Sequence, residues 1–216
     1  MSVLASILLS ALFASPLSAN TGNTLDTLRM YQERSERISY FAAYAGDARV
    51  RRGGERSRYS NTSIFARDDE GNYHAQDHIQ NGRIVVDVYF IDGVVTFCNQ
   101  REKVCKRQDP DKTPGTRTGA VIKKIEDGGM DVVNARYSKA TLNGNEAVRF
   151  NVVLKNNSRE EMIVLLLDEK TGVPLVYRSR ITDENYRSDL KEEVFAFIEV
   201  PEDLLEIQIP EEYEVE

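Results

Sequence analysis

The sequence predicts a mainly β protein of the α+β class, in which one helix precedes a strongly curved antiparallel sheet. From residue 38 onward, apolar and polar side chains alternate with the period of two that is typical of half-buried strands. Turn-forming residues separate these segments, as in the Asn143-Gly144 pair. The segments leave little room for crossover helices, so neighbouring strands are expected to pair antiparallel. An open sheet of about nine or ten strands is expected to curl.

The first 19 residues have the character of a signal peptide. Residues 3–19 carry no charge and are mostly apolar, and Pro16 and small residues precede Ala19. The stretch is short for a transmembrane helix, which needs about 20 apolar residues. Cleavage after Ala19 would leave residues 20–216 as a single exported domain, in the periplasm or at the cell surface. The alternative is an uncleaved N-terminal anchor, which the missing Lys or Arg near Met1 leaves open.

The order of the elements follows from periodicity and turn residues. A helix capped by Asn23 is expected to run to about Arg37, and a short helix is expected over Gly119–Ile125. Asn61 and Asn156, which begin the sequons "NTS" and "NNS", are expected at exposed strand ends or turns. The expected hairpins and strands cover residues 38–67, 82–98, 137–154, 162–181 and 192–200, followed by an extended tail over 201–215.

The two cysteines of the chain, Cys98 and Cys105, flank a polar segment between β-type residues. They are predicted to face each other across a hairpin and to form a disulfide, which agrees with export. Closing so short a loop stabilises the fold by about 2.5 kcal/mol. Free thiols are the alternative. A metal site would need two more ligands, and His74 and His78 lie in a strand-and-turn pattern, so neither a metal nor a cofactor is predicted.

Composition argues against nucleic-acid binding and against catalysis. The net charge is −7, and residues 189–216 hold eleven acidic side chains against one lysine. A nucleic-acid-binding protein needs a basic surface instead. The locally basic run 49–58 is interpreted as the solvated face of two strands, rather than as an anion site. The sequence has no Gly-x-Ser-x-Gly, His-Glu-x-x-His or phosphate-binding glycine motif. We therefore expect no enzyme.

Two late segments carry a family resemblance. The hairpin "LLLDEKTGVPLVYRSRI" (165–181) and the ending "EEVFAFIEVPEDLLEIQIPEEYEV" (192–215) resemble the periplasmic lipoprotein-carrier family. This family, with its LolA-like fold, includes outer-membrane lipoprotein-sorting proteins and regulators of anti-sigma factors. The resemblance implies an incomplete barrel with helices packed at its concave side.

The resemblance also implies a function. The expected activity is non-enzymatic binding of a lipid, acyl chain or lipidated protein in an apolar concave pocket, as a carrier or chaperone. The alternative is an envelope interaction or stress-sensor module that binds a membrane-protein partner. Candidate pocket residues lie in strands that look apolar on both faces, although each is also a candidate for plain core. They are Val86, Val88, Phe90, Val164, Leu166, Leu175, Tyr177, Phe195 and Phe197.

Overall fold

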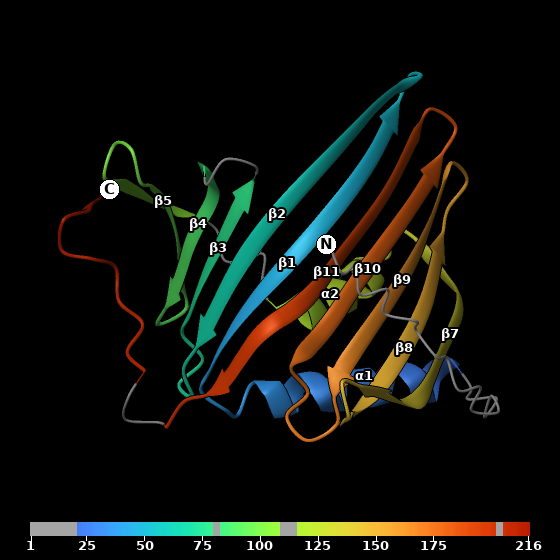
Figure 1. Cartoon of the computed structure of the whole chain (residues 1–216), viewed down its shortest axis with the longest axis horizontal. Helices are drawn as coiled ribbons and strands as arrows, with labels where there is room; N and C mark the ends of the chain where they lie inside the picture. Colours follow the sequence, from blue (N-terminus) through green and yellow to red (C-terminus); the bar gives the residue numbers. More distant parts are fainter. Residues whose placement is uncertain (1–20, 80–82, 109–115, 202–204) are drawn as a thin grey trace, which may run out of the picture.

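The computed structural model describes residues 21–79, 83–108, 116–201 and 205–216 (Figure 1). The predicted signal peptide lies outside these residues. Within them the chain forms two helices and twelve strands. The helices are α1 (Thr21–Ser35) and α2 (Arg117–Glu126). The strands are β1 (Tyr40–Arg52), β2 (Glu55–Arg67), β3 (Tyr73–Ile79), β4 (Arg83–Ile91), β5 (Val94–Asn99), β6 (Val104–Gln108), β7 (Asp131–Leu142), β8 (Asn145–Lys155), β9 (Arg159–Asp168), β10 (Pro174–Asp183), β11 (Tyr186–Glu199) and β12 (Glu214–Val215).

All twelve strands belong to one sheet, in the order β12-β6-β5-β4-β3-β2-β1-β11-β10-β9-β8-β7. The sheet consists of two meanders, β1–β6 and β7–β11, which join where β1 pairs with β11. Every pairing is antiparallel except that of β12 with β6. The mainly β, antiparallel prediction is therefore confirmed, and the parallel β12 is an addition to it.

The sheet is open and is not strongly curled, so the expected strong curvature was wrong (Figure 1). The reason lies in the distribution of the core. The helices pack with β7, β8 and β9 in the main apolar cluster, which occupies one end of the sheet. Because this cluster has no residue from β12 or its neighbours, it does not bring the β12 edge of the sheet close to the β7 edge.

The sheet has two faces with different coverings. The helix face carries Phe150 and Leu165, which pack against Leu28 of α1 and Val121 of α2. The outer face carries Tyr89, against which Ile207 of the C-terminal segment packs. Neither helix of the described chain is long and apolar enough to span a bilayer.

The helix boundaries differ slightly from the expected ones. Helix α1 begins at Thr21 and ends at Ser35, so Asn23 lies within its first turn and the expectation that Asn23 caps the helix was wrong. Helix α2 begins earlier than expected because Thr116 is its N-cap, and the Thr116 hydroxyl accepts a hydrogen bond of 3.0 Å from the Gly119 amide.

Two turns follow the predicted chemistry. Asn143 and Gly144 both have positive φ, 52° and 85°, as a two-residue hairpin turn requires. In the β9–β10 turn, Asp168 Oδ1 accepts hydrogen bonds from the Thr171 amide and hydroxyl, both at 2.8 Å. A Cβ atom on Gly172 would overlap the Tyr31 carbonyl oxygen, so this glycine lets α1 sit directly on the turn. The hairpin at 165–181 is thus part of the scaffold.

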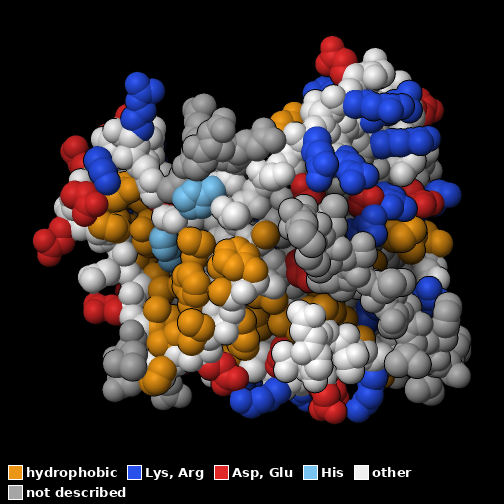
Figure 2. Space-filling model, in the orientation of Figure 1, with side chains coloured by type: hydrophobic (Ala, Val, Ile, Leu, Met, Phe, Trp, Pro, Cys, Tyr) orange, Lys and Arg blue, Asp and Glu red, His pale blue; other side chains and the backbone are white. Residues whose placement is uncertain are grey.

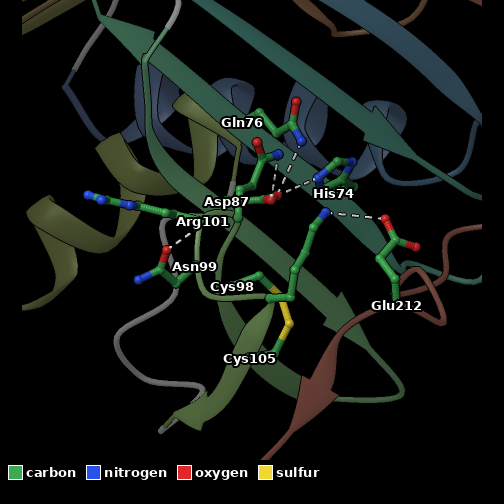
Figure 3. The surroundings of a disulfide bond; sticks show 10 residues. His74, Gln76, Asp87, Cys98, Asn99, Arg101, Cys105 and Glu212 are labelled. Carbon is green, nitrogen blue, oxygen red and sulfur yellow. Dashed lines mark hydrogen bonds and ion pairs between the residues drawn. A yellow bond between two sulfur atoms is a disulfide. The ribbon is translucent and has the colours of Figure 1, made fainter.

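The predicted disulfide is present. Cys98 in β5 lies directly opposite Cys105 in β6, and their sulfur atoms are bonded (Figure 3). Strand β6 in turn pairs with β12, so the disulfide connects the C-terminal strand to the body of the sheet.

Candidate ligand-binding face

A ladder of five aromatic rings crosses the helix face beyond the main core. The register places one ring on each of β11, β1, β2, β3 and β4, and successive ring centroids lie 6.1, 5.7, 5.3 and 5.1 Å apart. Such distances suit favourable ring pairs, each of which contributes about 0.5–1.5 kcal/mol beyond its buried area. The ladder consists of Phe197, Tyr40, Phe65, Tyr73 and Phe90.

The rings of this aromatic ladder differ in exposure. Tyr40 and Tyr73 are buried, at 1% and 4% exposed. Phe65, Phe90 and Phe197 are only half-buried. The second and fourth rings of the ladder are therefore anchored, while the three phenyl rings keep some apolar surface in contact with solvent.

Four of the predicted pocket residues lie on the helix face. Val88 and Phe90 follow the same side of β4, and Phe197 belongs to the ladder. Tyr177 packs against the main core. Val88 is fully buried, whereas Phe90, Tyr177 and Phe197 are half-buried.

Val164 and Leu166 lie on the outer face instead. Strand β9 presents Ile163, Leu165 and Leu167 to the helices, and all three are 0% exposed. Because side chains alternate along a strand, Val164 and Leu166 point to the opposite face and are half-buried there. Placing them in the same pocket as Phe90 was wrong in this respect.

The remaining three predicted residues are Leu175, Phe195 and Val86. Leu175 is buried next to a register shift at the start of β10. Phe195 has no partner residue at a bulge opposite Ala43 and Tyr44, and it is 65% exposed. Val86 lies in β4, but its side chain is outside the described part of the structure. That any of the nine residues lines a ligand pocket stays a prediction.

A buried carboxylate joins the start of α2 to the sheet. The Glu192 side chain is 2% exposed, and its Oε1 accepts hydrogen bonds from Arg117 Nη2 at 2.7 Å and Asn61 Nδ2 at 3.2 Å. Asn61 is therefore half-buried within β2, not at an exposed strand end as expected. A side chain on Gly46 would overlap Asn61 Oδ1, so a glycine is needed at this close approach.

The Arg117 guanidinium affects the charges around it. Burial raises the pKa of Asp77, an effect that Arg117 opposes and that Glu192 reinforces. Arg117 also lies over the Tyr177 ring, 5.7 Å from its centroid. Burial raises the pKa of Tyr44 above its ordinary value. Arg117 thus faces two carboxylates, Glu192 and Asp77, and connects the start of α2 to the sheet.

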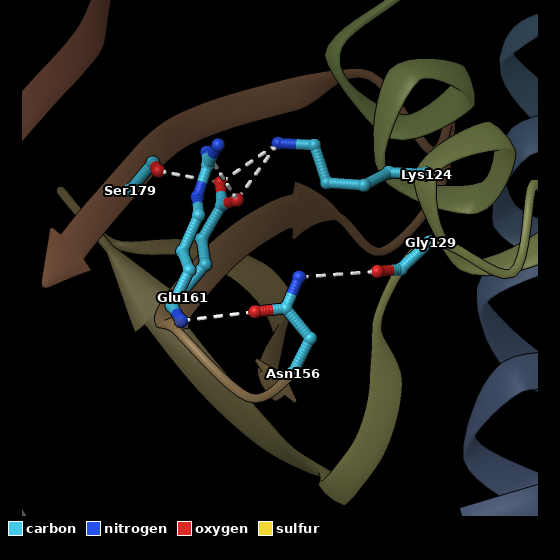
Figure 4. Close-up of polar contacts among 6 residues, drawn as sticks. Lys124, Gly129, Asn156, Glu161 and Ser179 are labelled. Atoms are coloured by element: carbon cyan, nitrogen blue, oxygen red, sulfur yellow. Dashed lines mark hydrogen bonds and ion pairs between the residues drawn. The ribbon is translucent and has the colours of Figure 1, made fainter. Parts of the chain in front are cut away.

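A second buried carboxylate holds the other end of α2 (Figure 4). The Glu161 side chain is 1% exposed and accepts hydrogen bonds from Lys124 Nζ at 2.8 and 3.0 Å. Ser179 Oγ and Arg159 Nη2 also donate to it, at 2.8 and 3.2 Å. Nearby, Asn156 is exposed in the β8–β9 turn, as predicted.

A histidine–carboxylate pair lies on the outer face, near the disulfide (Figure 3). His74 Nε2 is 2.8 Å from Asp87 Oδ1, and the His74 ring stacks on Tyr89 with centroids 4.1 Å apart. Burial tends to raise the pKa of Asp87, but hydrogen bonds from His74, Gln100 and Gln76 have the larger, opposite effect. The pKa of Asp87 is therefore below its ordinary value. Among the described residues no serine or thiol donates to this pair, and none of the His, Cys, Asp and Glu groups there could hold a metal ion. Asp87 is thus a buried carboxylate whose two oxygens both have hydrogen-bond partners.

Comparison with known proteins gives only structural similarities. No protein-family model and no curated protein matches the chain. The MucA/MucB complex of Pseudomonas aeruginosa matches with 18% identity and a TM-score of 0.47, over 89% of this chain and 63% of that chain. The chain thus spans less than two thirds of the length of MucB.

Two further solved structures are similar. LprF from Mycobacterium bovis matches with 11% identity and a TM-score of 0.44, over 93% of this chain and all of that chain. The LolA superfamily protein NE2245 from Nitrosomonas europaea matches with 8% identity and a TM-score of 0.34, over 82% of this chain and 96% of that chain. These similarities fall on the group that the sequence resembles. Their TM-scores are below 0.5, so the function of this chain is inferred from its own residues.

Proposed function

We propose that the protein is a non-enzymatic, exported carrier that holds a lipid, an acyl chain or the lipidated end of a protein along the aromatic ladder. The half-buried rings of Phe65, Phe90 and Phe197 carry this proposal. They form an apolar strip beyond the part of the helix face that α1 and α2 fill. An acyl chain on such a strip gains about 0.8 kcal/mol for each buried CH₂ group.

The chemistry of the strip suits an uncharged chain. Beside Phe90 the same face continues with Val88 and Val95, which are buried and offer no hydrogen bonds. Binding of an acyl chain requires apolar area and the exclusion of water, and no reacting group. The Cys98–Cys105 disulfide supports export, because disulfides persist in oxidising compartments.

The second candidate is an envelope module that binds a membrane-associated protein. Phe195 and Ile198 favour it, because they are 65% and 59% exposed near each other in β11. Contiguous exposed apolar surface often marks contact sites with other proteins.

Binding of a fluorescent fatty acid tests the carrier proposal, with Phe90→Glu as the test variant and Leu166→Glu as its matched control. Both residues are half-buried apolar side chains of the same sheet, but they lie on opposite faces. Phe90→Glu should abolish binding while the protein stays folded, and Leu166→Glu should leave binding intact. Circular dichroism and melting temperature monitor the fold of each variant.

Each outcome has a distinct meaning. Equal loss of binding in both folded variants would contradict a site on the helix face. Unfolding of Phe90→Glu alone would show that Phe90 is close-packed core, because a buried unpaired charge costs several kcal/mol. No binding by the unmodified protein would favour the interaction module.

A further inference from the structure

Seven arginines gather on the outer face, at the end of the sheet far from α1. In Figure 2 their blue side chains occupy the upper right of the molecule, over the upper ends of β2, β1, β11 and β10. This arginine patch consists of Arg49, Arg51, Arg56, Arg58, Arg178, Arg180 and Arg187, with Asp47 and Asp189 among them. It is a concentrated positive surface on a protein whose net charge is −7.

The strand register creates this patch from distant parts of the chain. Arg51 of β1 lies directly opposite Arg56 of β2 on one side and opposite Arg187 of β11 on the other. Like charges in directly opposite positions destabilise a sheet. The fold thus keeps three cations in one cross-strand row at a cost to its own stability.

The two aspartates compensate only part of the patch. Asp189 accepts from Arg178 at 2.9 and 2.7 Å and from Arg180 at 2.8 Å. Asp47 pairs with Arg58 at 3.3 Å. Within the part of the chain that the structure describes, no carboxylate pairs with the remaining four, which are Arg49, Arg51, Arg56 and Arg187.

A groove of about 580 Å³ lies at this end of the sheet, and residues of β1, β2, β10 and β11 line it. Its lining includes Arg49, Arg51 and Arg187 together with the residues that alternate with them along the strands, such as Val50 and Ser188. The lining residues include no aromatic side chain, so the groove lacks the stacking surfaces on which nucleic-acid bases bind.

We propose that the arginine patch binds phosphate groups of anionic phospholipids and docks this end of the sheet on a membrane surface. Guanidinium groups bind phosphate oxygens in a bidentate manner. The unpaired arginines spread over three strands and do not converge on one point, which suits a surface that carries many phosphates. The site goes beyond the proposed function, because it lies on the face opposite the aromatic ladder.

Sedimentation of the full-length protein with lipid vesicles tests the proposal. Vesicles contain phosphatidylcholine alone or with phosphatidylglycerol, at low and at high salt. The test variant is Arg51→Gln/Arg56→Gln/Arg187→Gln. The matched control Arg101→Gln/Arg107→Gln/Lys155→Gln removes three exposed cations from the β5–β6 turn, β6 and β8. Both variants change the net charge equally.

The unmodified protein should bind the anionic vesicles, and salt should weaken this binding. The test variant should lose binding on the order of 100-fold, as expected for three cations at an anionic surface, while the control variant retains it. Equal losses in both variants, or equal binding to neutral vesicles, would overturn the proposal.

Two further measurements distinguish membrane docking from binding of a soluble polyanion and from a loss of stability. Binding to a soluble sulfated polysaccharide without binding to anionic vesicles would assign the patch to a different polyanion and would overturn the membrane proposal. The test variant should melt no lower than the unmodified protein, since it removes opposed like charges. Fatty-acid binding should survive in the test variant, so failure here is distinguishable from failure of the carrier proposal.

Discussion

Replacing Lys124 with methionine is expected to lower the free energy of unfolding by about 2 kcal/mol. Removing one partner of a fully buried ion pair costs about 3–5 kcal/mol. Here Glu161 is 1% exposed, but it keeps its hydrogen bonds from Ser179 and Arg159. The Lys124 side chain is itself 37% exposed, so water reaches the site and the cost falls below that range.

The matched control is Lys123→Met, one residue earlier in the same helix. The Lys123 and Asp127 side chains are 50% and 61% exposed, and exposed pairs of this kind contribute about 0–1 kcal/mol. Urea unfolding followed by circular dichroism measures both variants. A loss of about 2 kcal/mol corresponds to a melting temperature lower by about 4–8 °C in a chain of this size.

A double-mutant cycle assigns the effect to the contact with Glu161. In the Glu161→Gln background, Lys124→Met should cost at least about 1 kcal/mol less than it does alone. If the Lys123 and Lys124 variants lose equal stability, or if the coupling energy is near zero, the buried pair does not anchor α2 and the reasoning fails.

Two further predictions concern the disulfide and a charge cluster. Thiol labelling of unreduced, denatured protein should detect no free cysteine, and Cys98→Ser/Cys105→Ser should lose about 2.5 kcal/mol of stability; two labelled thiols per chain would contradict this. Hydrogen bonds from Arg178 and Arg180 lower the pKa of Asp189 from 3.8 to about 2. Because the folded-state pKa is depressed, the stabilisation from Asp189 is complete above pH 4 and is lost as the pH falls from about 4 to 2. An NMR titration of Arg178→Gln should show a higher pKa for Asp189, and an unchanged value would refute this assignment.

Local sequence signals were enough for the hairpins. The Asn143-Gly144 turn, the Asp168–Gly172 turn and the Cys98–Cys105 pair all lie where short-range chemistry places them. Each depends on residues within a few positions of one another, so no long-range information is needed.

The faces of some strands were not predictable in the same way. Strand β9 reads "REEMIVLLLD", with apolar residues on both faces, so its alternation does not show which set meets the helices. The structure gives the helix face to Leu165 and leaves Leu166 outside. Asn61 presents a similar case, because its partner Glu192 is 131 residues away in the chain.

The arginine patch also depends on long-range pairing. The run 49–58 alone predicts a solvated basic face, and that part of the patch was evident from the sequence. Arg180 and Arg187 join it only because β11 pairs with β1 across the junction of the two meanders. Nothing local in either segment indicates this pairing.

The two buried carboxylates also restrict how a ligand could reach the helix face. Moving α2 away from the sheet would separate Glu192 from Arg117 and Glu161 from Lys124. Each carboxylate would then lose a charged partner, and the two losses together would cost several kcal/mol. A ligand therefore gains more by lying on the half-buried phenyl rings beyond α2 than by displacing the helix. This comparison favours the aromatic ladder over the main core as the binding surface.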